Sequence, residues 1–239
     1  MWKALTADSI LPYALLGMTA VTGLVDAVSF LSLGHVFTAN MTGNIVLLAF
    51  ASTGVPQVSL ARSITALLGF LAGAAVGGRI MAGASAVVQL RAASSVFALE
   101  IVFLVGATLA ALGYRVVSSP HFLPLYAMIA FTAIAMGMRN AAVRKLAVPD
   151  LTTTVLTLTI TGIAADSSLA RGTNPRVQRR VAAVVAMFAG AALGSIALRH
   201  SVHGSRFFRR TVVTLQPRVA DIVAVALRKK RRKGLEVVS

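Results

Sequence analysis

Long apolar blocks separated by short polar connections organise the chain, and seven such blocks can be drawn along its 239 residues. A helix that crosses the hydrocarbon core of a bilayer needs about 20 mainly apolar residues, and most of the blocks approach that length. The blocks are Ile10–Leu33, Phe37–Thr53, Ile64–Met81, Ser94–Tyr114, Phe122–Met138, Leu151–Ala165 and Val181–Leu198. The pattern predicts an all-α, polytopic membrane helix bundle of about seven transmembrane helices.

The second and sixth blocks differ from the others because they are short and polar. The second contains Thr38, Asn40, Thr42 and Asn44, and the sixth contains Thr152, Thr153, Thr154, Thr157, Thr159 and Thr161. Backbone groups that face lipid must be satisfied within a helix. Two alternatives follow: these blocks are helices shielded by their neighbours, or they are broken, re-entrant segments that line a cavity.

An internal repeat relates the first three blocks to the last three, at an offset that drifts from 113 to 117 residues. The matched segments are Tyr13-Ala14 with Tyr126-Ala127, Gly23–Ala27 with Gly137–Ala141, Arg62 with Arg179, and Ala72–Gly77 with Ala189–Gly194. The repeat predicts a 3+1+3 order: repeat one at about 10–83, a linker helix at about 93–114 and repeat two at about 121–199. If all seven blocks span, the two three-helix repeats are parallel, as in some transporters.

Composition agrees with a membrane protein. Hydrophobic residues make up 57% of the chain and charged residues only 13%, against about 25% charged in soluble domains. There are no cysteines, which excludes disulfides and thiolate chemistry, and the four histidines show no metal-ligand spacing. No catalytic triad or pair of catalytic carboxylates is apparent. We therefore expect no enzyme activity, no metal and no cofactor.

Basic charge is concentrated after the last block. The net charge is +16, and the residues from Arg199 onward contribute +9 of it, from eleven basic and two acidic residues. We expect a transmembrane domain over 1–203 and, over 204–239, a cytoplasmic tail that is either amphipathic or disordered. The tail ends in the basic run Arg228, Lys229, Lys230, Arg231, Arg232 and Lys233. Such runs bind anionic lipid headgroups, and no base-reading motif suggests nucleic acid.

The tail also bears on orientation. Seven spans place the two termini on opposite sides of the membrane, and the positive-inside rule then favours a cytoplasmic C-terminus. That orientation leaves the basic loop Arg171–Arg180 facing outward, which conflicts with the same rule.

Polar residues inside apolar blocks are the candidate functional residues, because they are costly in a bilayer and need partners. Asp26 lies deep in the first block and suits either a proton or cation site or a structural hydrogen bond. An ion pair between Asp26 and Arg139 is a further expectation, because Arg139 adjoins the repeat match of Asp26, and Glu100 is a candidate for ion coupling. The candidate binding residues are Asp26, Asn40, Thr42, Asn44, Asn140, Thr153 and Thr157. Interhelical hydrogen bonding is the alternative role for the amides and hydroxyls.

Two stretches are similar to signatures of the YoaK family, small bacterial membrane proteins that carry a domain of unknown function. They are Thr22–Phe30 with Gly34–Asn44, and Asn140–Thr157 in the second half. The resemblance covers roughly residues 10–200 and implies a multi-pass protein of the bacterial cytoplasmic membrane. Leu158 stands where the family pattern suggests glycine, and the basic tail is not part of the pattern. The resemblance implies no substrate or reaction.

Two functions therefore stand as hypotheses. The first is a small transporter or permease of a polar solute or ion, with a site between the two repeats, where such carriers place theirs. The second is a non-transporting assembly or regulatory protein anchored by the basic tail. Both hypotheses imply contact with the lipid bilayer, and both are compatible with a homo-oligomer.

Overall fold

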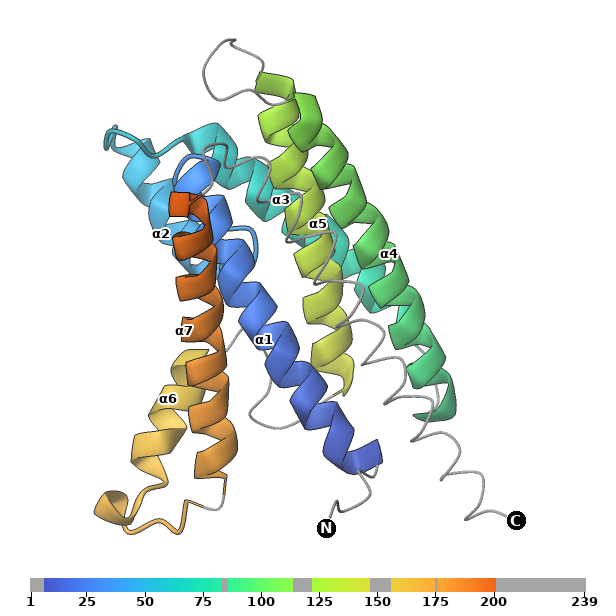
Figure 1. The fold of residues 1–239 in the computed structure, drawn as a ribbon, viewed down its shortest axis with the longest axis vertical. Coiled ribbons are helices and arrows are strands. Elements are labelled where there is room, and N and C mark those ends of the chain that lie inside the picture. The colour runs from blue at the N-terminus through green and yellow to red at the C-terminus, as the bar shows by residue number, and fades with distance from the viewer. Residues whose placement is uncertain (1–6, 83–85, 114–121, 147–155, 175, 201–239) are drawn as a thin grey trace.

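The chain folds as a bundle of α-helices (Figure 1). A computed structural model describes residues 7–82, 86–113, 122–146, 156–174 and 176–200. The elements are α1 (Ala7–Ser32), α2 (Met41–Ser52), α3 (Leu60–Ile80), α4 (Ala86–Gly113), α5 (Phe122–Leu146), α6 (Leu156–Ala165), the 3-10 turn η1 (Ser168–Ala170) and α7 (Val177–His200). No strand occurs in these ranges, so the all-α class is confirmed.

Five of the helices are long and apolar enough to cross a membrane. The candidate spans are Tyr13–Ser32, Leu60–Ile80, Arg91–Ala111, Leu123–Leu146 and Val177–Arg199. The other two helices, α2 and α6, have 12 and 10 residues. At a rise of 1.5 Å per residue they reach about 15–18 Å, roughly half of a hydrocarbon core about 30 Å thick. The second apolar block therefore contains a half-length helix, and the described part of the helix in the sixth block, Leu156–Ala165, is of similar length.

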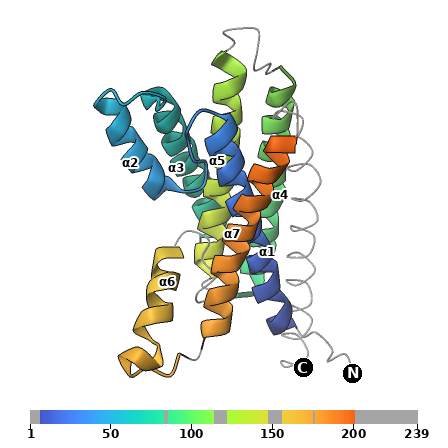
Figure 2. The ribbon, with the colours of Figure 1, turned by 60° about the vertical axis from the view of Figure 1, so that its left-hand side comes forward.

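The direction of the helices corrects the expected parallel repeats. Figures 1 and 2 show α1 and α5 running in opposite directions along the bundle. The physical reason is the short α2: it does not cross, so the chain reverses three times between α1 and α5, through α3 and α4. The parallel arrangement required seven crossings, and with five long helices it is wrong.

Glycines join α3 to α5. Gly69, Gly73 and Gly77 are buried along one face of α3, spaced one helical turn apart. A Cβ at Gly73 would overlap the Ile134 carbonyl of α5, and one at Gly77 would lie 2.8 Å from the Met138 carbonyl oxygen. The two backbones therefore approach as closely as only glycine permits.

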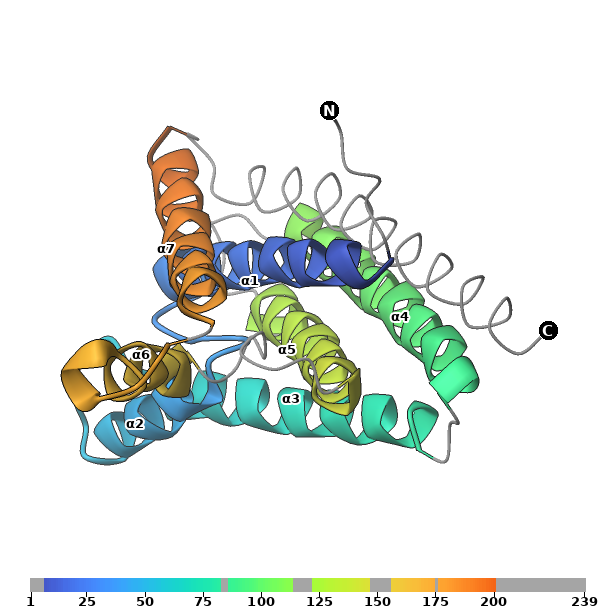
Figure 3. The same cartoon turned by 90° about the horizontal axis from the view of Figure 1, so that it is seen from below.

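The same kind of contact joins α1 to α7. A Cβ at Gly190 would overlap the Ala20 carbonyl, and one at Gly194 would lie 3.0 Å from the Leu24 carbonyl oxygen. Seen from below, α7 lies beside α1 and α3 beside α5 (Figure 3). Each tight pair thus joins a helix of the first half of the chain to a helix of the second half.

The linker helix α4 covers α5 on another side. Phe103 of α4 and Phe131 of α5 pack with ring centroids 6.1 Å apart, and Gly106 of α4 lies over the Phe131 ring. Buried Leu104, Ala107, Met128 and Ile129 continue the apolar contact into the core beside α1.

Residues 33–40, which we call the α1–α2 segment, break the helix before α2 begins. Gly34 has φ +88°, a left-handed conformation that glycine adopts freely, and the His35 N–H donates to the Phe30 carbonyl at 3.0 Å. Helix α2 then starts behind Asn40, whose side chain accepts from the Gly43 N–H at 3.1 Å. Each end of this non-helical stretch is therefore specified by local sequence.

Candidate functional site

Asp26 of α1 holds the α1–α2 segment in place. Its Oδ1 accepts from the backbone N–H of Ala39 at 2.8 Å and from that of Thr38 at 3.2 Å. The side chain comes from the penultimate turns of α1, and the residue is only 5% exposed. Non-helical backbone inside a bilayer needs partners for its N–H groups, and Asp26 supplies them. One of the two carboxylate oxygens of Asp26 therefore makes structural hydrogen bonds, which was one of the two roles expected from the sequence.

Asn44 ties the same segment to α2. Its Nδ2 donates to the Phe37 carbonyl at 2.5 Å, and its Oδ1 accepts from the Phe37 N–H at 2.9 Å. This reciprocal pair uses the amide as a backbone substitute and buries Asn44 to 1% exposure. Asn44 therefore shapes the segment and does not offer its amide to a ligand.

Two buried oxygens of this region have no hydrogen-bond partner in the part of the chain that the structure describes. They are Oδ2 of Asp26 and Oγ1 of Thr38. Thr38 is wholly buried, and its own N–H is bonded to the other carboxylate oxygen of Asp26. Buried polar atoms nearly always have a hydrogen-bond partner. Two buried oxygens without a partner, on residues that are hydrogen-bonded to each other, therefore need an explanation.

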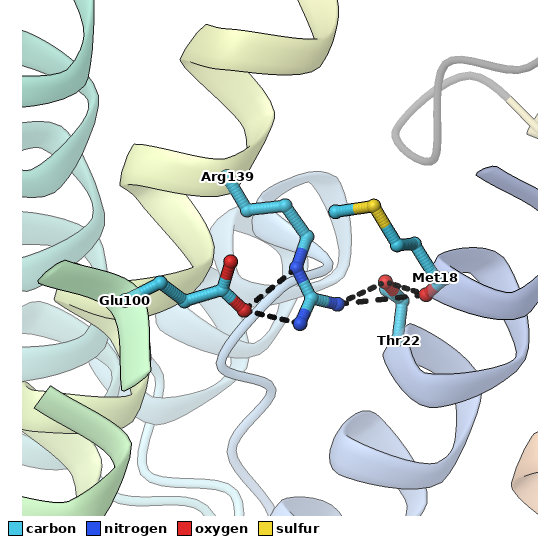
Figure 4. Close-up of polar contacts among 4 residues, drawn as sticks. All are labelled: Met18, Thr22, Glu100 and Arg139. Atoms are coloured by element: carbon cyan, nitrogen blue, oxygen red, sulfur yellow. Dashed lines mark hydrogen bonds and ion pairs between the residues drawn. The ribbon is translucent and has the colours of Figure 1, made fainter. Parts of the chain in front are cut away.

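Glu100 and Arg139 form a buried ion pair at the contact of α4, α5 and α1 (Figure 4). The Nε of Arg139 donates to Oε1 of Glu100 at 2.9 Å, and Nη2 contacts the same oxygen. The Nη1 of Arg139 turns to α1, where it donates to Thr22 Oγ1 at 3.3 Å and to the Met18 carbonyl at 3.5 Å. Arg139 thereby joins α4 and α5 to α1.

The expected ion pair between Asp26 and Arg139 is therefore absent from the described residues. Arg139 is paired with Glu100 instead, and Asp26 binds the backbone of the α1–α2 segment. The physical reason lies in the helix directions: because α5 runs against α1, Arg139 meets α1 at Met18 and Thr22, one turn or more before Asp26. Glu100 takes part in a packed polar network.

The remaining predicted site residues lie apart from these two networks. Asn40, Thr42 and Thr157 are exposed near the starts of α2 and α6, and Asn140 is partly buried on α5 beside Arg139. Thr153 and the basic run 228–233 lie outside the described residues. The exposed set shares one property: it stands at the N-terminal ends of the two half-length helices.

Those two helix starts face each other. Figures 1 and 2 place α2 toward one end of the bundle and α6 toward the other, on the same side, with both helices starting near mid-height. Figure 3 shows α6 over α2 when the bundle is seen from below. The N-terminal end of α2 carries the positive end of its helix dipole, and the described part of α6 begins at Leu156. The start of α2 and the described start of α6 therefore point toward the middle of the bundle from opposite sides.

Side chains cap the C-terminal end of α6. Arg180 of α7 donates to the Gly162 carbonyl and to Asp166, each at 2.6 Å, and Asn174 donates to the Ile163 carbonyl at 3.1 Å. Asp166 is a boundary residue paired with Arg180. A positive charge at a helix C-terminus is stabilising, so this end of α6 is anchored structurally.

No group of three or more His, Asp or Glu side chains that could hold a metal ion occurs among the described residues.

Sequence reasoning missed the partner of Arg139 and the specific roles of Thr22 and Asn44. The signal for the ion pair was present, because the acidic Glu100 lies inside the fourth apolar block and the basic Arg139 directly follows the fifth. Opposite charges buried in the same membrane domain are expected to pair. The Asn44 bonds to Phe37 could not be anticipated, because they depend on the helix breaking before Met41.

Comparison with known proteins gives a family and no activity. The family model described as "Protein of unknown function (DUF1275)" matches residues 14–214. The chain is similar to the UPF0700 transmembrane protein YoaK of Bacillus subtilis, at 39% identity over 156 residues. That match covers 65% of this chain and 65% of the relative, so it leaves about a third of each outside. No solved structure matches this chain.

Proposed function

We propose, for this chain, which belongs to the DUF1275 family of multi-pass membrane proteins, that it is a small carrier of a polar solute. One observation carries the proposal: the two half-length helices α2 and α6 begin near mid-height and face each other from opposite ends (Figure 2). In many secondary transporters, discontinuous helices place their N-terminal ends at the substrate in this manner.

Two equivalent glycine contacts favour an inverted repeat and with it the proposal. Gly73 meets Ile134 between α3 and α5, and Gly190 meets Ala20 between α7 and α1. These residues occupy matched positions in the two halves of the sequence, so the tight contacts occur twice. Because α1 and α5 run oppositely, the halves would be related by an axis in the membrane plane, which is the common arrangement in transporters.

The polar residues at mid-height also favour an aqueous path. Asn40, Thr42 and Thr157 are exposed at the starts of α2 and α6. Polar side chains at the depth of the bilayer centre face a bundle interior or water in preference to lipid. We assign the solute site to the space at these two helix starts, with Asn140 and Thr153 as further candidates from the sequence.

Five spans change the orientation argument. The starts of α1, α4 and α7 and the ends of α3 and α5 lie toward one end of the bundle (Figure 1). Near these helix ends the sequence carries Arg79, Arg91, Arg144, Lys145, Arg171, Arg176, Arg179 and Arg180. Of the described basic residues, Arg62 and Arg199 lie toward the other end. The positive-inside rule then favours a cytoplasmic location for the start of α1, and the basic loop Arg171–Arg180 no longer conflicts with it.

Reporter fusions test that orientation. A fusion in the α3–α4 connection, residues 83–85, should report cytoplasm, and one in the α4–α5 connection, residues 114–121, should report the outer side. The opposite pattern would overturn it. The cytoplasmic C-terminus stays a prediction, because α7 ends toward the outer side and the residues after His200 lie outside the described ranges. A fusion after Ser239 decides it.

Uptake measurements test the carrier itself. Cells that lack the gene and cells that overexpress it should differ in the uptake of at least one polar metabolite when a broad metabolite set is compared. Exposed Thr42 offers a suitable variant: Thr42→Val should abolish that difference while the amount of folded protein in the membrane stays unchanged. No difference between the two cell types for any polar metabolite would contradict transport.

The alternative is a non-transporting assembly or regulatory protein that acts through its basic tail. This alternative rests on the run of six basic residues at 228–233, because such runs bind anionic lipid headgroups. Deleting residues 204–239 separates the two functions: a carrier should keep its uptake without the tail, whereas a tail-driven protein should lose its cellular phenotype. Thr42→Val should leave that phenotype intact if the tail acts alone.

A further inference from the structure

We propose that Asp26 and Thr38 bind a small monovalent cation, sodium in its simplest form, between the end of α1 and the α1–α2 segment. The use of that ion to drive uptake rests on the carrier function, but its binding does not. The proposal starts from the two buried oxygens without a hydrogen-bond partner among the described residues, Asp26 Oδ2 and Thr38 Oγ1.

Backbone hydrogen bonds to Asp26 bring the two residues together. The Thr38 N–H lies 3.2 Å from Asp26 Oδ1, and the next N–H, that of Ala39, lies 2.8 Å from the same atom. Both of these bonds go to Oδ1, and the Asn40 N–H also interacts with the carboxylate. The other oxygen, Oδ2, has no hydrogen-bond partner among the described residues. Asp26 is 5% exposed and Thr38 is fully buried, so bulk water does not satisfy either oxygen.

The charge of Asp26 has no cationic partner among the described residues. Arg139, which hydrogen-bonds one turn earlier on α1 at Thr22, is paired with Glu100. Arg62 donates to the Gly34 carbonyl at 3.3 Å, at the opposite end of the α1–α2 segment from Thr38. A buried carboxylate without a counter-charge is costly, and a bound cation removes that cost.

The ligand chemistry selects a hard, singly charged ion. A carboxylate and a hydroxyl oxygen are hard donors that suit such cations. One carboxylate balances one positive charge, whereas a divalent ion would leave a buried net charge. The surrounding backbone is non-helical between Leu33 and Asn40, and carbonyl oxygens of unwound backbone are among the groups that coordinate sodium in carriers.

Thermal unfolding of the purified full-length protein in detergent tests binding directly. The melting midpoint is compared in sodium chloride and in choline chloride at equal ionic strength. An ion that binds only the folded state raises the midpoint as its concentration increases. We expect a rise of several degrees in sodium for the wild-type protein, with no knowledge of the transported solute required.

Two variants locate the effect. Asp26→Asn keeps Oδ1 as an acceptor for both N–H groups, so it should fold yet lose the sodium-dependent shift. Thr38→Val preserves the shape but removes the hydroxyl, and should lose most of the shift, while Thr38→Ser should retain it. Thr108→Val is the matched control, because the Thr108 hydroxyl is buried but bonds within α4, to Leu104 at 2.9 Å; its sodium shift should equal that of the wild type.

Equal midpoints in sodium and choline for the wild type would overturn the proposal, as would a sodium shift that survives in both Asp26→Asn and Thr38→Val. A stabilisation at low pH that replaces the sodium effect, and that is lost in Asp26→Asn, would assign a proton to the site and also overturn it. A sodium shift without any solute uptake would support the cation site and count against the carrier function instead.

Discussion

The helices of this molecule make two kinds of contact. In the pairs α3–α5 and α1–α7, glycines such as Gly73 and Gly190 bring backbones together without any polar side chain. At the junction of α1 with α4, α5 and the α1–α2 segment, the contacts are instead made by Asp26, Glu100 and Arg139. Both kinds of contact are buried, but only the second contains polar side-chain atoms that a ligand could bind.

The difference separates architecture from chemistry. Glycine contacts depend on shape alone, and they fix which helices are neighbours. Within the polar junction, the Glu100–Arg139 pair is engaged with protein on both sides, whereas Asp26 leaves one oxygen unused. Substitutions should therefore rank by stability loss in one order and by functional loss in another.

The largest loss of stability is expected at the glycine contacts. Gly73→Leu would drive a side chain into the Ile134 carbonyl of α5, which the backbone cannot avoid without separating the helices. Overpacking typically costs about 1–3 kcal/mol, and a backbone collision exceeds that range. The measurement is the folded fraction in the membrane by fluorescence size exclusion of a fusion protein. Gly78→Leu is the control, because nothing lies within 4 Å of its Cβ position; equal losses in both would contradict the pairing.

A somewhat smaller loss is expected at the ion pair. Arg139→Gln leaves the Glu100 carboxylate buried without its partner, and breaking such a pair costs about 3–5 kcal/mol. Glu100→Gln alone should be similarly damaging, while the double variant Glu100→Gln with Arg139→Gln should recover much of the loss. Unfolding in mixed detergent measures the three free energies. A double variant that is as unstable as the sum of the singles would show that the two residues act independently.

Asp26 should respond differently to two substitutions. Asp26→Ala removes the acceptor for the Thr38 and Ala39 N–H groups, and each buried unsatisfied group costs about 1–3 kcal/mol. Asp26→Asn retains that acceptor, so the same unfolding measurement should place it close to the wild type in choline. An Asn variant as unstable as the Ala variant would show that the negative charge itself holds the segment.

The smallest effect is expected at Thr22. Thr22→Val removes one hydroxyl from the Arg139 network, in which the Met18 carbonyl remains as an acceptor. Single interhelical hydrogen bonds in membranes average about 0.6 kcal/mol, so the free energy of unfolding should fall by roughly that amount. A loss as large as that of Arg139→Gln would mean that Thr22 organises the network.

Much of this architecture was predictable from sequence, and the features that were not can be named. Hydrophobic length identified the long helices. The spacing of Gly69, Gly73 and Gly77 in the sequence is itself typical of a helix-packing face. Their threonines and asparagines singled out the short helices. The point where α2 begins was not predicted, because no proline or glycine in Phe37–Asn40 marks a break. That error reversed the expected relation of α1 and α5.

The site was predictable residue by residue, but not contact by contact. Asp26, Asn44 and Glu100 stand out as polar residues in apolar blocks. Their partners depend on helix direction and on where α1 ends, neither of which a single sequence specifies. Gly34 was the available signal, because a glycine after an apolar block is typical of a helix C-terminus.

The central claim is that water reaches the facing starts of α2 and α6, and thiol labelling tests it most directly. The natural chain has no cysteine, so Thr42→Cys and Thr157→Cys each introduce one unique thiol. We expect both to react with a water-soluble, membrane-impermeant thiol reagent. Leu68→Cys, at an apolar residue of α3 that is 60% exposed, should not react. Unreactive thiols at both Thr42 and Thr157, matching Leu68, would contradict an aqueous path and with it the proposed carrier.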